Sequence, residues 1–157
     1  TPSLRYYGKD APNGTSGGNQ VYLGTQGRYS GRYRVVDGLL EGFVQVTTGT
    51  GANFGSGPIT MDMPLPCAGW QPDTWSTGHI YTDRSFGAPS SLDWFSQVLV
   101  KAGWTRGLLF TPVSGDFNDM KFHAATVDGR PGTGTPRIDN APSTGAVYTY
   151  NISYPVE

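Results

Sequence analysis

The feature that most constrains this sequence is a pair of alternating segments joined by Asp37-Gly38. Residues 28–36 alternate in character, as expected of a strand whose successive side chains point to opposite faces. Asp-Gly is a favoured dipeptide for a two-residue type I′ turn, which needs positive φ at both positions. Residues 39–48 are predicted to form the returning strand. The short turn sets the register, so that Val36 faces Leu39 and every further pair steps outward by one residue.

This register gives sensible neighbours on both faces of the predicted hairpin. On one face every pair is apolar or places a large side chain against glycine: Val35 with Leu40, Tyr33 with Gly42, Gly31 with Val44 and Tyr29 with Val46. The other face pairs Arg34 with Glu41, Arg32 with Phe43, Ser30 with Gln45 and Arg28 with Thr47. The first of these pairs predicts a salt bridge and the second a cation–π contact. Agreement on both faces predicts the hairpin more strongly than the turn dipeptide does alone.

Glycine and proline punctuate the rest of the chain. The 157 residues include 23 Gly and 12 Pro, and no long stretch offers a helical pattern free of them. Charged residues make up only 15%, whereas aromatic residues reach 13% and supply the bulk for a core. We therefore expect one all-β, antiparallel domain, a β-sandwich or jelly-roll-like fold built from many short strands.

Apolar runs bounded by turn residues place the remaining strands. We expect them at 58–65, 78–82, 97–102, 106–113, 120–127 and 146–154. A short helical turn is predicted around 91–95. Glycine-rich or proline-rich loops are predicted at 49–57, 67–77 and 128–145.

Residues 1–27 are polar and rich in glycine, which favours an extended segment in front of a β-sandwich domain over 28–157. One interpretation is a terminal linker. The other is an arm that lies on a neighbouring subunit, with Tyr6, Tyr7 and Tyr22 as its anchors.

Charge and cysteine content exclude several classes of protein. The net charge is −1, so no basic stripe is available for nucleic acid, and we expect no nucleic-acid partner. No apolar run is long enough for a membrane helix, and we expect no membrane partner. Cys67 is the single cysteine, cannot form an internal disulfide, and is expected to be a small buried side chain.

Catalytic patterns are weak. Glutamate occurs only at Glu41 and Glu157, which argues against the paired carboxylates of a glycosidase. The run 14–18 matches Gly-x-Ser-x-Gly, but it lies in a polar segment and not in the strand-to-helix turn that this motif needs. His79 and His123 lack the spacing of a metal-binding pair. We expect no enzyme activity, no cofactor and no metal.

Two sets of residues could make contacts from loops. Asp116, Asn118 and Asp119 bring oxygen side chains together as in a calcium site, but they lack the full acidic spacing of an EF-hand loop, and such residues are also common in turns. The tryptophans Trp70, Trp75, Trp94 and Trp104 lie in or beside predicted loops. They could fill the open ends of a sandwich, anchor a subunit interface or stack on sugar rings.

Several segments resemble a recurrent β-sandwich domain from the virions of tailed bacteriophages, above all those that infect actinobacteria. The segments that carry the resemblance are Gly31-Arg32-Tyr33-Arg34-Val35-Val36-Asp37-Gly38, Phe54-Gly55-Ser56-Gly57, Met63-Pro64-Leu65-Pro66, Ser143-Thr144-Gly145 and Tyr154-Pro155-Val156-Glu157. The match covers 28–66 and 140–157, while 67–139 departs from the family pattern. The resemblance implies a capsid decoration, head-fibre or minor tail protein, commonly a trimer.

These observations together predict a non-enzymatic structural protein on the outer surface of a virion, made in the bacterial host cytoplasm. The leading interpretation is a capsid decoration protein that stabilises the shell through contacts with the major capsid protein or other virion proteins, as a homotrimer. The alternative is a tail-fibre or minor tail domain that binds host glycans through Trp70, Trp75, Asp116, Asn118 or Asp119. A small hydrolase is a third, weaker interpretation.

Overall fold

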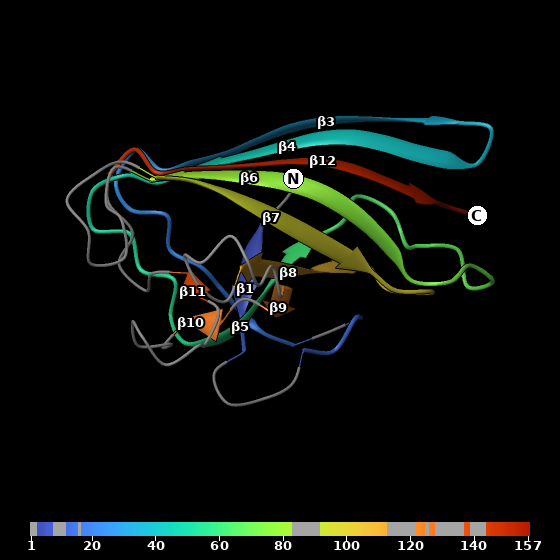
Figure 1. Cartoon of the computed structure of the whole chain (residues 1–157), viewed down its shortest axis with the longest axis horizontal. Coiled ribbons are helices and arrows are strands. Elements are labelled where there is room, and N and C mark those ends of the chain that lie inside the picture. The colour runs from blue at the N-terminus through green and yellow to red at the C-terminus, as the bar shows by residue number, and fades with distance from the viewer. Residues whose placement is uncertain are drawn as a thin grey trace.

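The computed structural model describes residues 3–7, 12–15, 17–82, 92–112, 122–124, 126–127, 137–138 and 144–157. Across these residues the chain is all-β and contains no helix (Figure 1). The strands are β1 (Leu4–Tyr6), β2 (Asn19–Gln20), β3 (Arg28–Val36), β4 (Leu39–Thr47), β5 (Gly57–Asp62), β6 (Thr74–Thr82), β7 (Leu92–Val100), β8 (Arg106–Pro112), β9 (Phe122–Ala124), β10 (Thr126–Val127), β11 (Arg137–Ile138) and β12 (Val147–Pro155).

One sheet contains these strands, in the order β11-β10-β5-β8-β7-β6-β12-β4-β3. Neighbours are antiparallel except for β10 and β11, which run parallel. The sheet curls over, so that β3, β4, β12, β6 and β7 form one layer and β1, β5 and β8 lie across from it (Figure 1). The predicted all-β, antiparallel fold class is confirmed. The two layers are parts of one continuous sheet, and β3 is the last strand at one of its ends.

The predicted hairpin is confirmed in its register. All nine residue pairs of β3 and β4 match, from Arg28 opposite Thr47 to Val36 opposite Leu39. Asp37 and Gly38 both have positive φ, of 50° and 75°, as a type I′ turn requires. The predicted salt bridge between Arg34 and Glu41 is present, with 2.7 Å between Nη2 and Oε2.

One detail of the hairpin differs from the prediction. Arg32 and Phe43 are opposite each other, but they do not make the expected cation–π contact. In the described part of the chain such contacts join Lys101 to Trp104 and Arg106 to Tyr7. Arg32 and Phe43 are both exposed. A cation–π contact at an exposed site is worth only about 0.5–1 kcal/mol, which does not oblige the guanidinium to stay over the ring.

Most of the other predicted strands are present with shifted ends. The prediction of a helical turn around 91–95 is wrong. Strand β7 begins at Leu92 and pairs along its whole length with β6. Strand β6 itself begins at Thr74, inside the expected loop 67–77. Local residue preferences are weak, and pairing with a long neighbouring strand overrides them here.

The described part of residues 1–27 packs on the domain itself. Strand β1 pairs with both β2 and β5 of the same chain. Leu4, Val21 and Leu23 are buried in the common core. These three apolar residues of an otherwise polar segment therefore serve as internal contacts of the domain.

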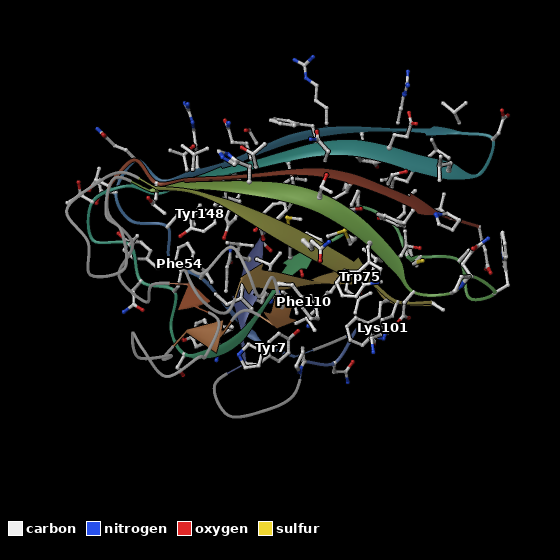
Figure 2. The ribbon with its side chains drawn as sticks, in the orientation of Figure 1. Tyr7, Phe54, Trp75, Lys101, Phe110 and Tyr148 are labelled. Carbon is white, nitrogen blue, oxygen red and sulfur yellow. The ribbon has the colours of Figure 1, made fainter. Side chains whose placement is uncertain are left out.

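The core lies between the two layers and is rich in tyrosine. Alternate residues of β12 are buried, including Tyr148, Tyr150, Ile152 and Tyr154. Tyr150 lies opposite Gly78 of β6, and a Cβ built on Gly78 would come within 2.1 Å of the Tyr150 ring. The Tyr148 ring packs against Phe54, with 5.4 Å between ring centroids (Figure 2). Burial raises the pKa of Tyr150 and Tyr154, so both phenols stay neutral.

The contact between Tyr150 and Gly78 predicts that Gly78→Ala destabilises the domain by about 1–3 kcal/mol, because overpacking in a dense core forces side chains and backbone to move. Urea denaturation measures this change. Gly69→Ala is the matched control, since the nearest atom to its Cβ would be 3.8 Å away, in the Glu157 side chain. Equal midpoints for the two variants would contradict the prediction.

Candidate interaction surface

Exposed apolar side chains concentrate on the β3–β4 hairpin. Among the residues that the structure describes, eight large apolar side chains are exposed, and five of them lie on this hairpin. They are Tyr33, Val35, Val36, Leu39 and Phe43. Isolated exposed apolar residues are ordinary, whereas a group on one element suggests an interaction site.

The five residues belong to two faces of the hairpin. Leu40 and Val44 of β4 are buried, and this defines the inner face that turns toward the core. Tyr33 and Val35 lie on this inner face, because they pair with Gly42 and Leu40. They remain exposed, and β3 is the last strand at this end of the described sheet.

Val36, Leu39 and Phe43 lie on the opposite, outer face. This outer apolar group (Val36, Leu39 and Phe43) stands beside the arginines of β3. Arg28 and Arg32 are exposed on the same face.

The hairpin turn lies beside the C-terminal end of the chain. The Val156 N–H donates to the Gly38 carbonyl at 2.8 Å, and the Ala68 N–H donates to the Pro155 carbonyl at 2.9 Å. Trp70 follows two residues later and is 70% exposed. The same end of the molecule therefore carries the turn, the C-terminal residues and an exposed tryptophan.

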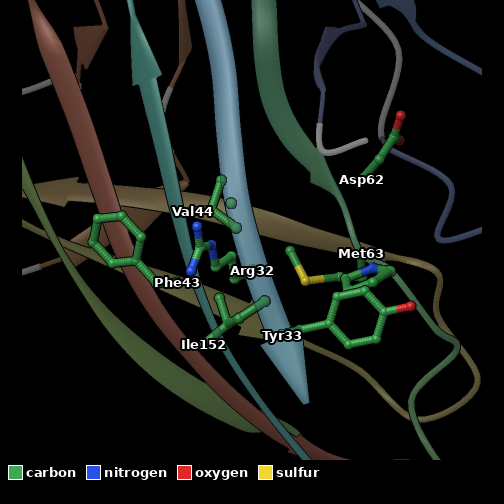
Figure 3. A pocket seen from close by; sticks show the side chains of 9 residues that line it. Arg32, Tyr33, Phe43, Val44, Asp62, Met63 and Ile152 are labelled. Carbon is green, nitrogen blue, oxygen red and sulfur yellow. The ribbon is translucent and has the colours of Figure 1, made fainter.

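A cavity of about 150 Å³ lies where the inner face of β3 approaches the end of β5 (Figure 3). It is lined by Gly31, Arg32, Tyr33, Phe43, Val44, Asp62, Met63, Pro64 and Ile152. Figure 3 shows the Tyr33 ring beside Met63, with Asp62 beyond them. The lining is mixed: apolar side chains such as Met63 and Ile152 lie beside the charged Arg32 and Asp62.

Asp62, at the rim of this cavity, joins the N-terminal segment to the sheet. Its carboxylate accepts from Arg5 Nε at 3.0 and 3.1 Å and lies 3.3 Å from Arg106 Nε. The Ser3 hydroxyl also donates to it. Two guanidinium groups thus share one carboxylate, so the cluster is held by charge-assisted hydrogen bonds.

Arg106 continues this network into the interior. It is only 7% exposed, and its Nη1 donates to the Gly17 carbonyl at 2.6 Å, to the Asn13 carbonyl at 3.4 Å and to the Tyr7 hydroxyl. A buried arginine needs such acceptors, because its guanidinium cannot lose its charge. The network fastens the described residues of the segments 3–7, 12–15 and 17–18 to strands β5 and β8.

The three tyrosines that were expected to anchor an arm have different positions. Tyr7 is buried against Arg106, and the Tyr6 ring covers Gly55. Both are therefore internal contacts of this domain. Tyr22 is exposed, and its backbone forms a bridge with Asn53.

The tryptophans also occupy different environments. Trp75 lies in strand β6 instead of the expected loop, is exposed, and packs edge-on against Phe110 with 4.9 Å between centroids (Figure 2). Trp104 lies over Gly14, with Lys101 Nζ 5.5 Å from its ring. Trp94 is within β7, and its side chain is outside the described part. Asp116, Asn118 and Asp119 all lie outside the described residues.

Reactive groups do not converge in the part of the chain that the structure describes. No group of three or more His, Cys, Asp or Glu side chains there could hold a metal ion. Cys67 is buried, and its burial, followed by the charge of Asp73, raises the pKa of the thiol. Burial also raises the pKa of Tyr29, whose hydroxyl accepts from the Leu4 N–H at 3.1 Å.

Sequence reasoning did not single out Asp62, Arg106 or the cavity. Asp62 and Arg106 are 44 positions apart, and nothing local indicates that they meet. The one available signal was an arginine at the start of a predicted apolar strand, where a charged residue needs a partner.

Among the described residues, no helix is present that could cross a membrane.

The network around Asp62 predicts that Asp62→Asn destabilises the protein by about 2–4 kcal/mol, because it removes the negative charge that lies beside the buried Arg106. We expect the N-terminal segment to become sensitive to protease first, and urea denaturation with limited proteolysis measures both effects.

Glu41→Gln is the control for Asp62→Asn, because it breaks an ion pair whose side chains are 74% and 44% exposed. Such a surface pair is worth less than about 1 kcal/mol. Similar losses for the two variants would show that Asp62 has no special role.

Comparison with known proteins gives no match: no family model, no curated protein and no solved structure is significantly similar to this chain.

Proposed function

We propose that this chain is a non-enzymatic structural protein on the outer surface of a bacteriophage particle. As a capsid decoration protein it would stabilise the head shell through contacts with the major capsid protein or other virion proteins. The observation that carries the proposal is the outer apolar group, which presents Val36, Leu39 and Phe43 on one exposed face. The sequence resemblance to virion β-sandwich domains supports the proposal that the particle is a tailed bacteriophage.

The hairpin is well suited to hold such a contact face. Strand β4 pairs over nine residues with β3 and over nine with β12, so the outer apolar group stands on a continuous ladder. A preorganised surface loses little conformational entropy on binding. Burial contributes about 25 cal/mol per Å² of apolar surface, and repetition over many copies makes a modest contact effective.

The outer face also carries Arg28 and Arg32, which would lie at the border of the contact. Interfaces commonly place apolar side chains at the centre and charged groups at the rim. The implied homotrimer belongs to the proposal as well, since a symmetric assembly would bring several hairpins to one shell.

A second function is favoured by Trp70, which is 70% exposed beside the C-terminal end. An aromatic ring that protrudes in this way can stack on a sugar ring. A tail-fibre or minor tail domain that recognises host surface glycans is therefore the alternative.

The test is binding of the purified protein to empty phage heads and, in parallel, to host cell envelopes, followed by imaging of labelled particles. We expect saturable, regularly spaced density on heads. The double variant Val36→Thr/Phe43→Thr should bind heads at least about tenfold more weakly, since a few large side chains near the centre of an interface carry most of its binding energy.

Tyr22→Ser is the matched control, because Tyr22 is exposed but lies outside the hairpin. It should bind heads like the unmodified protein. Binding to envelopes alone, with loss in Trp70→Ala, would overturn the decoration function in favour of the tail function.

A further inference from the structure

In the described part of the chain, no strand pairs with the outer edge of β3. Strand β3 is nine residues long, contains no proline, and ends the order of paired strands, with β4 on its other side. Edge strands are normally short, covered, bulged or interrupted by proline, because their unpaired backbone groups can bind another strand.

The register of the hairpin identifies the backbone groups at this edge. In a hairpin with a two-residue turn, the residues that flank the turn bond to each other, and bonded pairs then alternate. Val36, Arg34 and the other even-numbered residues of β3 therefore bond to β4. The N–H and C=O groups of Tyr29, Gly31, Tyr33 and Val35 point to the open edge.

Among the residues that the structure describes, none covers the inner face along this edge. Tyr33 is 53% exposed and Val35 45%, although both face the same side as the buried core residues of β4. The cavity of about 150 Å³ lies directly beside them, with Gly31 in its lining. A strand added beside β3 would cover both side chains, and its residue opposite Gly31 would lie beside the cavity that Gly31 lines.

The outer face of β3 determines the charge that such a strand needs. Arg34 is neutralised by Glu41, but Arg28 and Arg32 face no acidic residue in β4, since their opposites are Thr47 and Phe43. These two arginines are four residues apart and so lie on one face. Carboxylates at the matching positions of an added strand would pair with them.

A second copy of β3 fits this edge poorly. The antiparallel self-pairing that uses all four open residues places Tyr29 opposite Val35 and Gly31 opposite Tyr33. The same register places Arg32 opposite Arg32 of the other copy. Directly opposed like charges destabilise a strand pair, and basic residues on edge strands are a known protection against self-association.

We propose that the open edge of β3 is a strand-addition site for an extended segment of a partner protein, in which acidic residues alternate with apolar ones. The inference deepens the proposed assembly function and rests on it for the partner being a virion protein. The partner strand pairs antiparallel, sets carboxylates against Arg28 and Arg32, and inserts an apolar side chain opposite Gly31. Main-chain hydrogen bonds supply affinity and the alternate side chains supply specificity.

The test uses the full chain and a synthetic peptide as long as β3, with the sequence Thr-Val-Thr-Val-Glu-Leu-Thr-Val-Glu. In antiparallel register its two glutamates face Arg32 and Arg28, and its leucine faces Gly31. Fluorescence anisotropy with labelled peptide measures the dissociation constant. We expect saturable binding that becomes at least about tenfold weaker when both glutamates are replaced by lysine.

Two sets of variants identify the site. Tyr33→Pro removes an N–H at the open edge without breaking a bond to β4, and it should abolish binding, whereas Tyr33→Thr keeps the N–H and should retain most of it. The double variant Arg28→Glu/Arg32→Glu should lose the glutamate peptide and bind the lysine peptide instead. Circular dichroism confirms that each variant is folded.

Three outcomes would overturn the proposal: equal affinity for the glutamate and lysine peptides, unchanged binding in Tyr33→Pro, or self-association of the free protein that Tyr33→Pro removes. The last would assign the edge to a second copy. Peptide binding without binding to heads would leave the strand-addition site standing and reject the decoration function. If the Tyr33→Pro variant still binds heads and no peptide binds to the protein, the decoration function would stand and the strand-addition site would be rejected.

Discussion

The ionic cluster at Asp62 is the interaction on which the rest of this structure depends. One carboxylate joins Arg5 of the N-terminal segment to Arg106 of β8, and Arg106 then binds the carbonyls of residues 13 and 17. Without these contacts a polar, glycine-rich segment would have little reason to order. With them, Leu4, Val21 and Leu23 reach the core. A few charged side chains, in a chain that has few of them, thus hold the N-terminal segment against one side of the curled sheet.

The other side of the sheet stays open, and this asymmetry links the fold to the proposed functions. The N-terminal segment covers β5, whereas β3 at the far end of the order has no such cover among the described strands. The same hairpin therefore offers an outer apolar group, an open backbone edge and a partly covered cavity. All three belong to the proposed binding surface, and β4 beneath them is paired along its length with β12.

Where prediction from the sequence failed, nonlocal pairing was the cause. The segment 91–95 has local features of a helical turn, yet β7 pairs with β6 throughout. Trp75 was expected in a loop and belongs to β6 for the same reason. Tyr6 and Tyr7 were considered for a neighbouring subunit, but in the folded chain Gly55 and Arg106 lie beside them. Of the expected contact residues that the structure describes, Trp70, Trp75 and Tyr22 are exposed as a binding role requires.

The sequence by itself determined the all-β class, the turn at Asp37-Gly38 and every residue pair of the hairpin, because turn geometry and alternation act over a few neighbouring residues. Only the tertiary structure decided that Asp62 and Arg106 meet, that β3 ends the sheet, and that a cavity lies beside Gly31. These facts depend on which distant strands become neighbours. That choice is made by burial summed over the whole core, which no local pattern in the chain encodes.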